Sequence, residues 1–392
     1  MRIAIAVAAC LALGACATGP LGPEAPRDAR YFADDRFAAP SVRVDAADIF
    51  ALSPTMQAYL DNEIAPQARK RGRQVALVDA LYQQGELRLD YDTAVTRNAA
   101  EAFAARSGNC LSLVIMTAAF AKAMDLHVEY QKVVVEDVWA RAGDLYLAIG
   151  HVNLTMGRRR TDEGGFGHRV GKRPFESEGM IVDFLPSADL LRMRTFPLSE
   201  RTITAMYMNN RAVEALAVGR ADDAYWWARE AIVQSREYLV AYNTLGAIYH
   251  RHGDLDRAEE VLRFVLAREP DNPQTMTNLA TVLNDVGKTA EAQALSAALA
   301  RLEPEPPFAY FKNGLAALRA GDARTARDLF RKEIARSADY HEFHFWLAVA
   351  YVALNDTPEA RKHLAIAMQN STTRTDHEIY TAKLDRLGRV SN

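Results

Sequence analysis

Cysteine is scarce in this sequence: the chain has 392 residues and only three cysteines, Cys10, Cys16 and Cys110. Two of them lie in the first sixteen residues, so the main body has one thiol and no possible internal disulfide. The histidines are scattered and show no close spacing to Cys110, which argues against a zinc site. No dense acidic loop suggests calcium. We expect no metal ion and no cofactor.

Strong charge of one sign is absent as well. The formal net charge is -3 at pH 7, from 47 basic and 50 acidic residues. Proteins that bind nucleic acid show a basic footprint, so nucleic acid is not an expected partner. Hydrophobic residues make up 49% of the chain, an ordinary share for a folded protein. The length predicts two or three domains rather than one.

The chain also opens without a hydrophobic run of membrane-spanning length. Residues 3–13 are apolar but too few for a permanent transmembrane helix, and they are typical of a signal peptide. The next residues, Leu13-Gly14-Ala15-Cys16, resemble the lipobox of bacterial lipoproteins. That resemblance implies removal of residues 1–15, lipid on Cys16 and a membrane anchor in the bacterial cell envelope. Ala17 follows, which favours the outer membrane facing the periplasm. The alternative is an ordinary secretory signal.

Residues 16–52 are rich in Ala, Pro, Asp and Arg and have no sustained apolar period. This composition predicts a tether, although four apolar side chains are candidates to dock part of it: Tyr31, Phe32, Phe37 and Ile49. The first folded domain is expected over residues 53–204. It begins at Ser53-Pro54, a capping residue followed by proline, which is a good helix start.

The central feature of this domain is the stretch Arg106-Ser107-Gly108-Asn109-Cys110-Leu111-Ser112. Gly108 and Asn109 are turn residues, and the apolar run from Leu111 to Met124 predicts a buried helix. Cys110 would therefore occupy the first turn of that helix, where the helix dipole favours a thiolate. If the signal is removed and Cys16 is lipidated, Cys110 is the only free thiol in an oxidising compartment. That position favours a chemical role.

Two later segments supply partners for such a thiol. His151 lies in a predicted strand over residues 145–156, and Asp183 lies in another over residues 180–185. Taken singly, a buried cysteine, a strand histidine and an aspartate after Ile-Val are usually structural. Between the two strands lies a polar, glycine-rich insert over residues 157–179, expected to be a hairpin tip or a flap, and His168 within it is expected on the surface.

The order Cys110, His151, Asp183 on these elements resembles the transglutaminase-like superfamily of papain-type thiol enzymes, over about residues 75–190. The resemblance implies an α+β cysteine-proteinase-type fold, with Cys110 as nucleophile, His151 as base and Asp183 as the orienting carboxylate. The insert lengthens the His-to-Asp separation, and we expect the strand pairing to survive it. Leu111 replaces the aromatic residue of crosslinking enzymes, which favours hydrolysis.

The backbone N–H of Cys110 is a natural oxyanion donor at the helix start. A second donor is not identified by the sequence. Gln83, Gln84 and Tyr91 are the candidates.

From residue 205 onward the sequence is helical and periodic. Five residues of one unit, Gly246, Tyr249, Gly253, Ala258 and Pro270, have counterparts at offsets of 34 residues. This pattern strongly resembles tetratricopeptide repeats, which implies an all-α solenoid of helical hairpins. Five repeats are expected over residues 205–374, with a capping helix over residues 375–392.

Two functions follow from this organisation. One is a membrane-anchored cysteine peptidase or amidohydrolase whose repeats bind a protein or peptide. The alternative is a catalytically inactive envelope lipoprotein that acts as a repeat-based adaptor. Aromatic residues of the repeats are candidates to line a binding groove, although most aromatics at repeat positions are core: Trp226, Trp227, Tyr242 and Tyr249.

Overall fold

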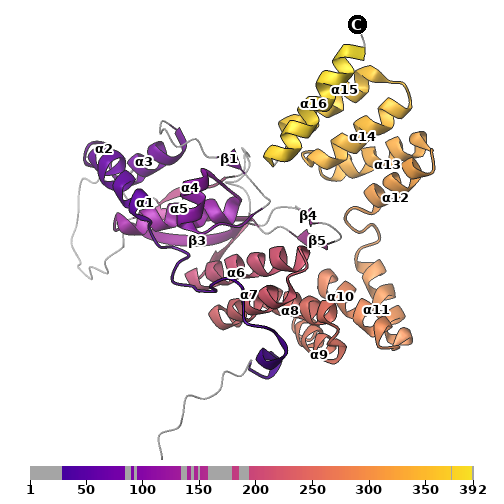
Figure 1. Cartoon of the computed structure of the whole chain (residues 1–392), viewed down its shortest axis with the longest axis horizontal. Coiled ribbons are helices and arrows are strands. Elements are labelled where there is room, and N and C mark those ends of the chain that lie inside the picture. Colours follow the sequence, from indigo (N-terminus) through magenta and orange to yellow (C-terminus); the bar gives the residue numbers. More distant parts are fainter. Residues whose placement is uncertain are drawn as a thin grey trace, which may run out of the picture.

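The computed structural model describes residues 29–83, 90–91, 95–133, 139–142, 145–148, 151–157, 179–184, 194–371 and 373–390. Cys10, Cys16, Gln84 and His168 lie outside these residues, as do the predicted signal peptide and most of the predicted insert. The described chain is mostly helical. An N-terminal segment leads into a front domain that contains a sheet, and helical hairpins follow to the C-terminus (Figure 1).

The front domain begins with helical turns, as its capping residues predict. Ser53 accepts a hydrogen bond from the Met56 amide, and Pro54 occupies the first helical position. Short π-helical segments, Leu60–Ile64 and Asp79–Gln83, interrupt the helices. The helices are α1 (Pro54–Tyr59), α2 (Ala65–Arg71), α3 (Arg73–Val78), α4 (Ala99–Ala105) and α5 (Cys110–Ala123).

Helix α5 is the centre of this domain. Every residue from Cys110 to Ala121 is buried, which explains why the helix is apolar around its whole circumference. It packs against two strands of a four-stranded antiparallel sheet with the order β7-β6-β3-β8. These strands are β3 (His127–Val133), β6 (His151–Gly157), β7 (Met180–Val182) and β8 (Thr195–Leu198).

Two short strand pairs complete the described β-structure. β1 (Asp90–Tyr91) runs parallel to β2 (Ser107–Gly108), and β4 (Trp139–Ala142) runs antiparallel to β5 (Leu145–Ala148). β6 and β7 are direct antiparallel neighbours, with Leu154 opposite Val182. The expected pairing across the long insert is therefore confirmed.

The hairpins begin earlier than the sequence predicted. Ser199 caps helix α6, which starts at Glu200, so the expected domain border at residue 204 falls inside this helix. Within the described residues the helices are α6 (Glu200–Ala217), α7 (Ala221–Gln234), α8 (Leu239–His252), α9 (Leu255–Leu266), α10 (Pro273–Asp285), α11 (Thr289–Leu302), α12 (Ala309–Arg319), α13 (Ala323–Arg336), α14 (His341–Ala353), α15 (Thr357–Gln369) and α16 (Arg374–Val390).

The turn inside each hairpin explains the period of the sequence. Its backbone has a positive φ at one residue per hairpin, and these residues are spaced by 34: Gly219, Gly253, Gly287, Gly321 and Asn355. Glycine adopts this left-handed conformation without steric cost, and asparagine is the next most tolerant residue. A helix–turn–helix unit is thus repeated in phase.

Apolar packing divides the hairpins into two groups. One core joins the N-terminal segment, the front domain and the hairpins up to Ala292. A second core begins at Phe308 and a third contains Tyr380, and both belong to the last hairpins and α16. The first hairpins are therefore continuous with the front domain. Among the described residues, no helix is both long enough and apolar enough to cross a bilayer.

Residues 29–52 differ from the predicted tether. They lie across α7, α8 and α9 before entering the front domain (Figure 1), and Tyr31, Phe37 and Ile49 are buried. The apolar side chains flagged in the sequence do dock. The sequence did not predict this ordered segment, because its contacts come from residues about 200 positions away.

Candidate thiol site

The turn before α5 places Cys110 at the first helical position. Asn109 is the N-cap, and its Oδ1 accepts hydrogen bonds from the Ser112 amide and the Ser112 hydroxyl, both at 2.9 Å. Gly108 is required by a close approach, because a Cβ at this position would lie 2.7 Å from the Cβ of Ser112. The Gly-Asn-Cys sequence therefore forms a tight, capped helix start, as the sequence predicted.

His151 and Asp183 meet because of the strand register. His151 is the first residue of β6, and Asp183 directly follows β7. Their side chains contact at 2.7 Å, from His151 Nε2 to Asp183 Oδ1. The other carboxylate oxygen accepts a 2.9 Å hydrogen bond from Asn153 Nδ2. Asn153 lies two residues after His151 in β6, and strand alternation places the two on the same face. The sequence assigned Asn153 no role. Asn153 holds the carboxylate.

Cys110 is the second partner that affects the pKa of His151. Because Nε2 faces Asp183, Nδ1 is the ring nitrogen left for the thiol. Burial by itself would lower the pKa of His151. The hydrogen bonds to Asp183 and Cys110, together with the negative charges on both, outweigh burial and raise this pKa to about 9. The imidazole is therefore protonated at neutral pH.

All three predicted site residues are brought together, in a site with little exposure. Cys110 retains 6% of its accessible surface and His151 retains 3%. The Asp183 side chain retains 7%. The site thus holds a thiol, an imidazole and a carboxylate, the three kinds of group that thiol acyl transfer would use.

The oxyanion candidates are only partly described. The Cys110 amide lies at the N-terminus of α5, where helix amides point outward. Tyr91 pairs with Gly108 in the parallel β1–β2 ladder, so its backbone lies beside the cysteine turn. Gln83 ends the second π-helical segment. Among the described residues, no group of three or more His, Cys, Asp or Glu side chains is arranged to hold a metal ion.

A buried threonine connects this turn to the first hairpin. Thr96 is 1% exposed, and its hydroxyl accepts hydrogen bonds from Asn109 Nδ2 at 2.9 Å and Asn210 Nδ2 at 3.2 Å. Its amide donates to Glu214 at 2.7 Å, and its carbonyl accepts from Arg211 at 3.0 Å. Helix α6 thereby holds the residue that orients the N-cap of α5.

Replacing Thr96 with valine should weaken this connection. Valine keeps the shape but removes the acceptor for two amide groups, so we expect a loss of about 1–2 kcal/mol of stability. We also expect slower alkylation of Cys110, because the N-cap loses its support. Thermal unfolding and alkylation rates measure the two effects. Thr96→Ser keeps the hydroxyl and should retain both properties; equal losses in the serine and valine variants would contradict the assignment.

Comparison with known proteins identifies the hairpins. Residues 249–315 and 311–373 match the tetratricopeptide repeat family. Over 144 residues, or 36% of this chain, the sequence is 29% identical to the TPR repeat-containing protein PA4667 of Pseudomonas aeruginosa. The C-terminal region contains tetratricopeptide repeats. The chain covers 24% of the length of that relative. Their similarity is one between tetratricopeptide repeat proteins.

Solved structures that match part of the chain include two bacterial proteins. One is a thermophilic TPR protein of Thermus thermophilus, with a TM-score of 0.30, 19% identity, and coverage of 46% of this chain and 98% of that chain. Another is MamA of Desulfovibrio magneticus, with a TM-score of 0.26, 19% identity, and coverage of 44% and 96%.

The four aromatic residues that the sequence offered as candidates for a binding groove do not line an open groove. Tyr242 and Tyr249 are fully buried, and Trp227 is 6% exposed, so these three belong to the core of the tetratricopeptide hairpins. Trp226 is partly buried, and its indole N–H donates to the carbonyl of Ala38 in the N-terminal segment. The surface on this side is already covered by the chain itself.

Proposed function

We propose that the front domain is a transglutaminase-like thiol acyl-transfer domain and that the tetratricopeptide repeats bind its protein or peptide substrate. The observation that carries the proposal is the hydrogen-bonded series His151–Asp183–Asn153, together with the effect of Cys110 on the pKa of His151. The comparisons support protein binding by the repeats. The lipid anchor on Cys16 at the periplasmic face of an outer membrane is part of the same proposal.

The proposed chemistry uses the protonated histidine. With His151 as imidazolium, Cys110 is the thiolate, which attacks an amide carbonyl carbon. The Cys110 amide faces the developing oxyanion at the helix N-terminus. His151 then gives its proton to the leaving amine, and an acyl-enzyme remains. Neutral His151 takes a proton from water, which attacks the thioester, releases the acid and restores the thiolate–imidazolium pair.

Asp183 serves this cycle by orientation and charge. Its 2.7 Å contact with Nε2 fixes the ring so that Nδ1 points to Cys110, and it stabilises the imidazolium. Asn153 prevents the carboxylate from turning away. Because Leu111 follows the cysteine, without the aromatic of crosslinking enzymes, hydrolysis is favoured over transamidation.

A second candidate is an adaptor without catalysis. The relative and the family matches concern the repeats alone, and Cys110 retains only 6% of its surface. In an adaptor the same three side chains would be a buried structural network, and binding would be the whole function.

Alkylation of Cys110 distinguishes the two candidates. The full chain, with Cys16 replaced by serine, is treated with an iodoacetamide probe from pH 4 to 9, alongside a His151→Ala variant. An ionised pair should be labelled at pH 5.5, well below the ordinary thiol pKa of about 8.5, and the variant should be about 100-fold slower there. Labelling that follows an ordinary thiol in both proteins supports the adaptor. His127→Ala, in the same sheet, is the matched control and should behave as wild type.

A further inference from the structure

The N-terminal segment is held by its backbone. Tyr225 accepts the Ala33 amide at 2.8 Å, Asp222 accepts the Ala38 amide at 2.9 Å, and Asp223 accepts the Ser41 amide at 2.7 Å. Carbonyls of the segment are bonded as well, by Tyr249 to Tyr31 at 2.6 Å and by Trp226 to Ala38 at 2.7 Å. Side chains of the repeats thus bind the main chain of a segment that contains two 3-10 turns, Ala29–Tyr31 and Asp34–Arg36, and main-chain hydrogen bonds of this kind are common in peptide-binding sites.

Two aromatic side chains of the segment serve as anchors. Tyr31 is 3% exposed and meets Phe264 of α9, with ring centroids 4.7 Å apart. Phe37 is 6% exposed and stacks on Tyr225 of α7, with centroids 4.0 Å apart and planes at 1°. The anchors are six residues apart. Each contributes buried aromatic area of the kind that dominates interface energies.

Charged pairs set the direction of the segment between the anchors. Asp34 contacts Arg229 of α7 at 2.8 Å, and Arg36 contacts Asp254 before α9 at 2.7 Å. Asp34 also accepts a hydrogen bond from the Tyr225 hydroxyl. The repeat helices therefore contact one acidic and one basic residue of the segment in addition to its two aromatic residues.

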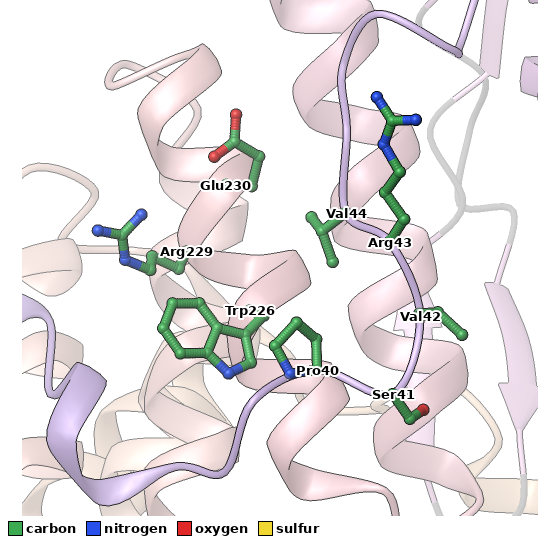
Figure 2. Close-up of a pocket in the computed structure, with 8 residues that line it drawn as sticks. All are labelled: Pro40, Ser41, Val42, Arg43, Val44, Trp226, Arg229 and Glu230. Atoms are coloured by element: carbon green, nitrogen blue, oxygen red, sulfur yellow. The ribbon is translucent and has the colours of Figure 1, made fainter.

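The contact is looser after the second anchor. Residues 40–44 and α7 enclose a hollow of about 450 Å³, lined also by Trp226, Arg229 and Glu230. Figure 2 shows Pro40 beside the Trp226 indole, whereas Arg43 extends away from it. Val42 is 37% exposed. An incoming peptide therefore has unfilled surface at the end of the segment where displacement would begin.

We propose that this face of α7, α8 and α9, which we call the segment site, is a peptide-binding site whose resident ligand is residues 29–44. The partner is a peptide segment with aromatic residues at its first and seventh positions, an acidic residue at the fourth and a basic residue at the sixth. Binding of such a partner displaces residues 29–44. The site lies on α7, the end of α8 and α9, so the first helices of the later repeats remain uncovered by it.

The proposal refines the protein-binding part of the proposed function and does not involve Cys110. Main-chain recognition tolerates different sequences, and the two anchors and two charges supply selectivity. A tethered segment competes at an effective concentration in the millimolar range. A free peptide that binds the empty site at about 10 μM should therefore appear roughly 100-fold weaker on the intact chain.

The test uses a fluorescent synthetic peptide of residues 29–44 and the full chain. Wild type is compared with the double variant Tyr31→Ala/Phe37→Ala, whose own segment has lost both anchors. By fluorescence anisotropy, we expect the peptide to bind the double variant roughly 100-fold more tightly than wild type. A control peptide with alanine at both aromatic positions should bind neither protein. Adding Trp226→Ala and Arg229→Ala to the double variant should weaken binding at least tenfold.

Equal binding to wild type and the double variant, or equal binding of the two peptides, would overturn the proposal. If the double variant fails to fold, a protease site inserted at Ala47–Asp48 leaves the contacts of the segment with α7, α8 and α9 unchanged. After cleavage, the labelled peptide should replace the released fragment in proportion to its concentration. Absence of exchange at 100-fold excess overturns the proposal. Because every readout is binding, these outcomes are independent of Cys110 alkylation.

Discussion

Raising the pH from 6.5 to 9.5 should cost the wild-type protein about 3 kcal/mol of folding free energy through His151. The pKa of this residue rises from an ordinary 6.5 to about 9 in the folded protein, since its bonds to Asp183 and Cys110 and their charges outweigh its burial. A raised folded pKa stabilises the fold fully below pH 6.5. That stabilisation is lost as the pH rises through 9. The contribution of His151 is therefore smallest at alkaline pH.

The Asp183→Asn variant tests whether Asp183 helps to raise the pKa of His151. It removes one of the two anionic partners while preserving size, so the alkaline loss of stability should shrink, and the variant should be less stable than wild type at pH 6.5. Urea unfolding at each pH, together with hydrogen exchange of the α5 amides, measures both effects. His127→Gln alters an exposed histidine of the same sheet and should leave the profile unchanged. Identical pH profiles of wild type and Asp183→Asn contradict the contribution of Asp183 to the pKa of His151.

The positions of the three site residues follow from short-range patterns. A glycine–asparagine turn before an apolar run predicts a capped helix with Cys110 at its start. Alternation along a strand places His151 and Asn153 on one side. The register of β6 against β7 then determines which side chains meet. Leu154 pairs with Val182, so the next pair of positions places Asn153 opposite Asp183. Only the pairing of β6 with β7 had to be assumed across the insert.

The hydrogen bonds that hold the site in place join residues far apart in the chain, so the local sequence could not predict them. Thr96 reads as an ordinary loop residue, yet its polar groups bond to Asn109 on one side and to α6 on the other. Those partners are up to 118 positions away, in the case of Glu214. No periodicity reports such a contact. The predicted border between domains fell inside α6 for the same reason, because this helix serves both the front domain and the first hairpin.

The repeats could be predicted from the sequence, whereas the ordered N-terminal segment could not. Each hairpin needs a left-handed turn residue and small packing positions, so the 34-residue period is visible in the sequence alone. Residues 29–44 form only two short 3-10 turns, and their apolar side chains follow no helical or strand period. Their order depends on acceptors and donors supplied by α7, α8 and α9. Composition therefore predicted a tether where the structure has a bound segment.

The last hairpin should lose stability in acid, in contrast to the thiol site. His363 has its pKa lowered from 6.5 to about 4, first by burial and then by the nearby His344, Lys362 and Arg331, against a smaller opposing effect of Glu359. A lowered folded pKa means that the neutral form stabilises the fold above pH 6.5. About 3 kcal/mol is lost as the pH falls from 6.5 to 4.

The geometry explains why both rings must be neutral. His344 Nε2 donates to the carbonyl of Ala338 at 2.7 Å, which leaves its Nδ1 as an acceptor. That nitrogen lies 2.9 Å from Nδ1 of His363, which therefore donates to it. Protonating His344 would place two N–H groups against each other, and burial already lowers its pKa. The pair is thus a neutral hydrogen bond that acid breaks.

His363→Gln keeps an N–H donor for His344 but does not titrate near pH 5. We expect hydrogen exchange of α14 and α15, corrected for intrinsic rates, to accelerate in wild type below pH 6 and much less in this variant. His250→Gln, in a different hairpin, should behave as wild type. Equal acid sensitivity of wild type and His363→Gln would contradict the assignment. Because the apolar clusters of α12–α16 are separate from the core that contains the thiol site, the acid loss should remain local. His151 and His363 then limit stability from opposite sides of neutral pH, in different parts of the chain.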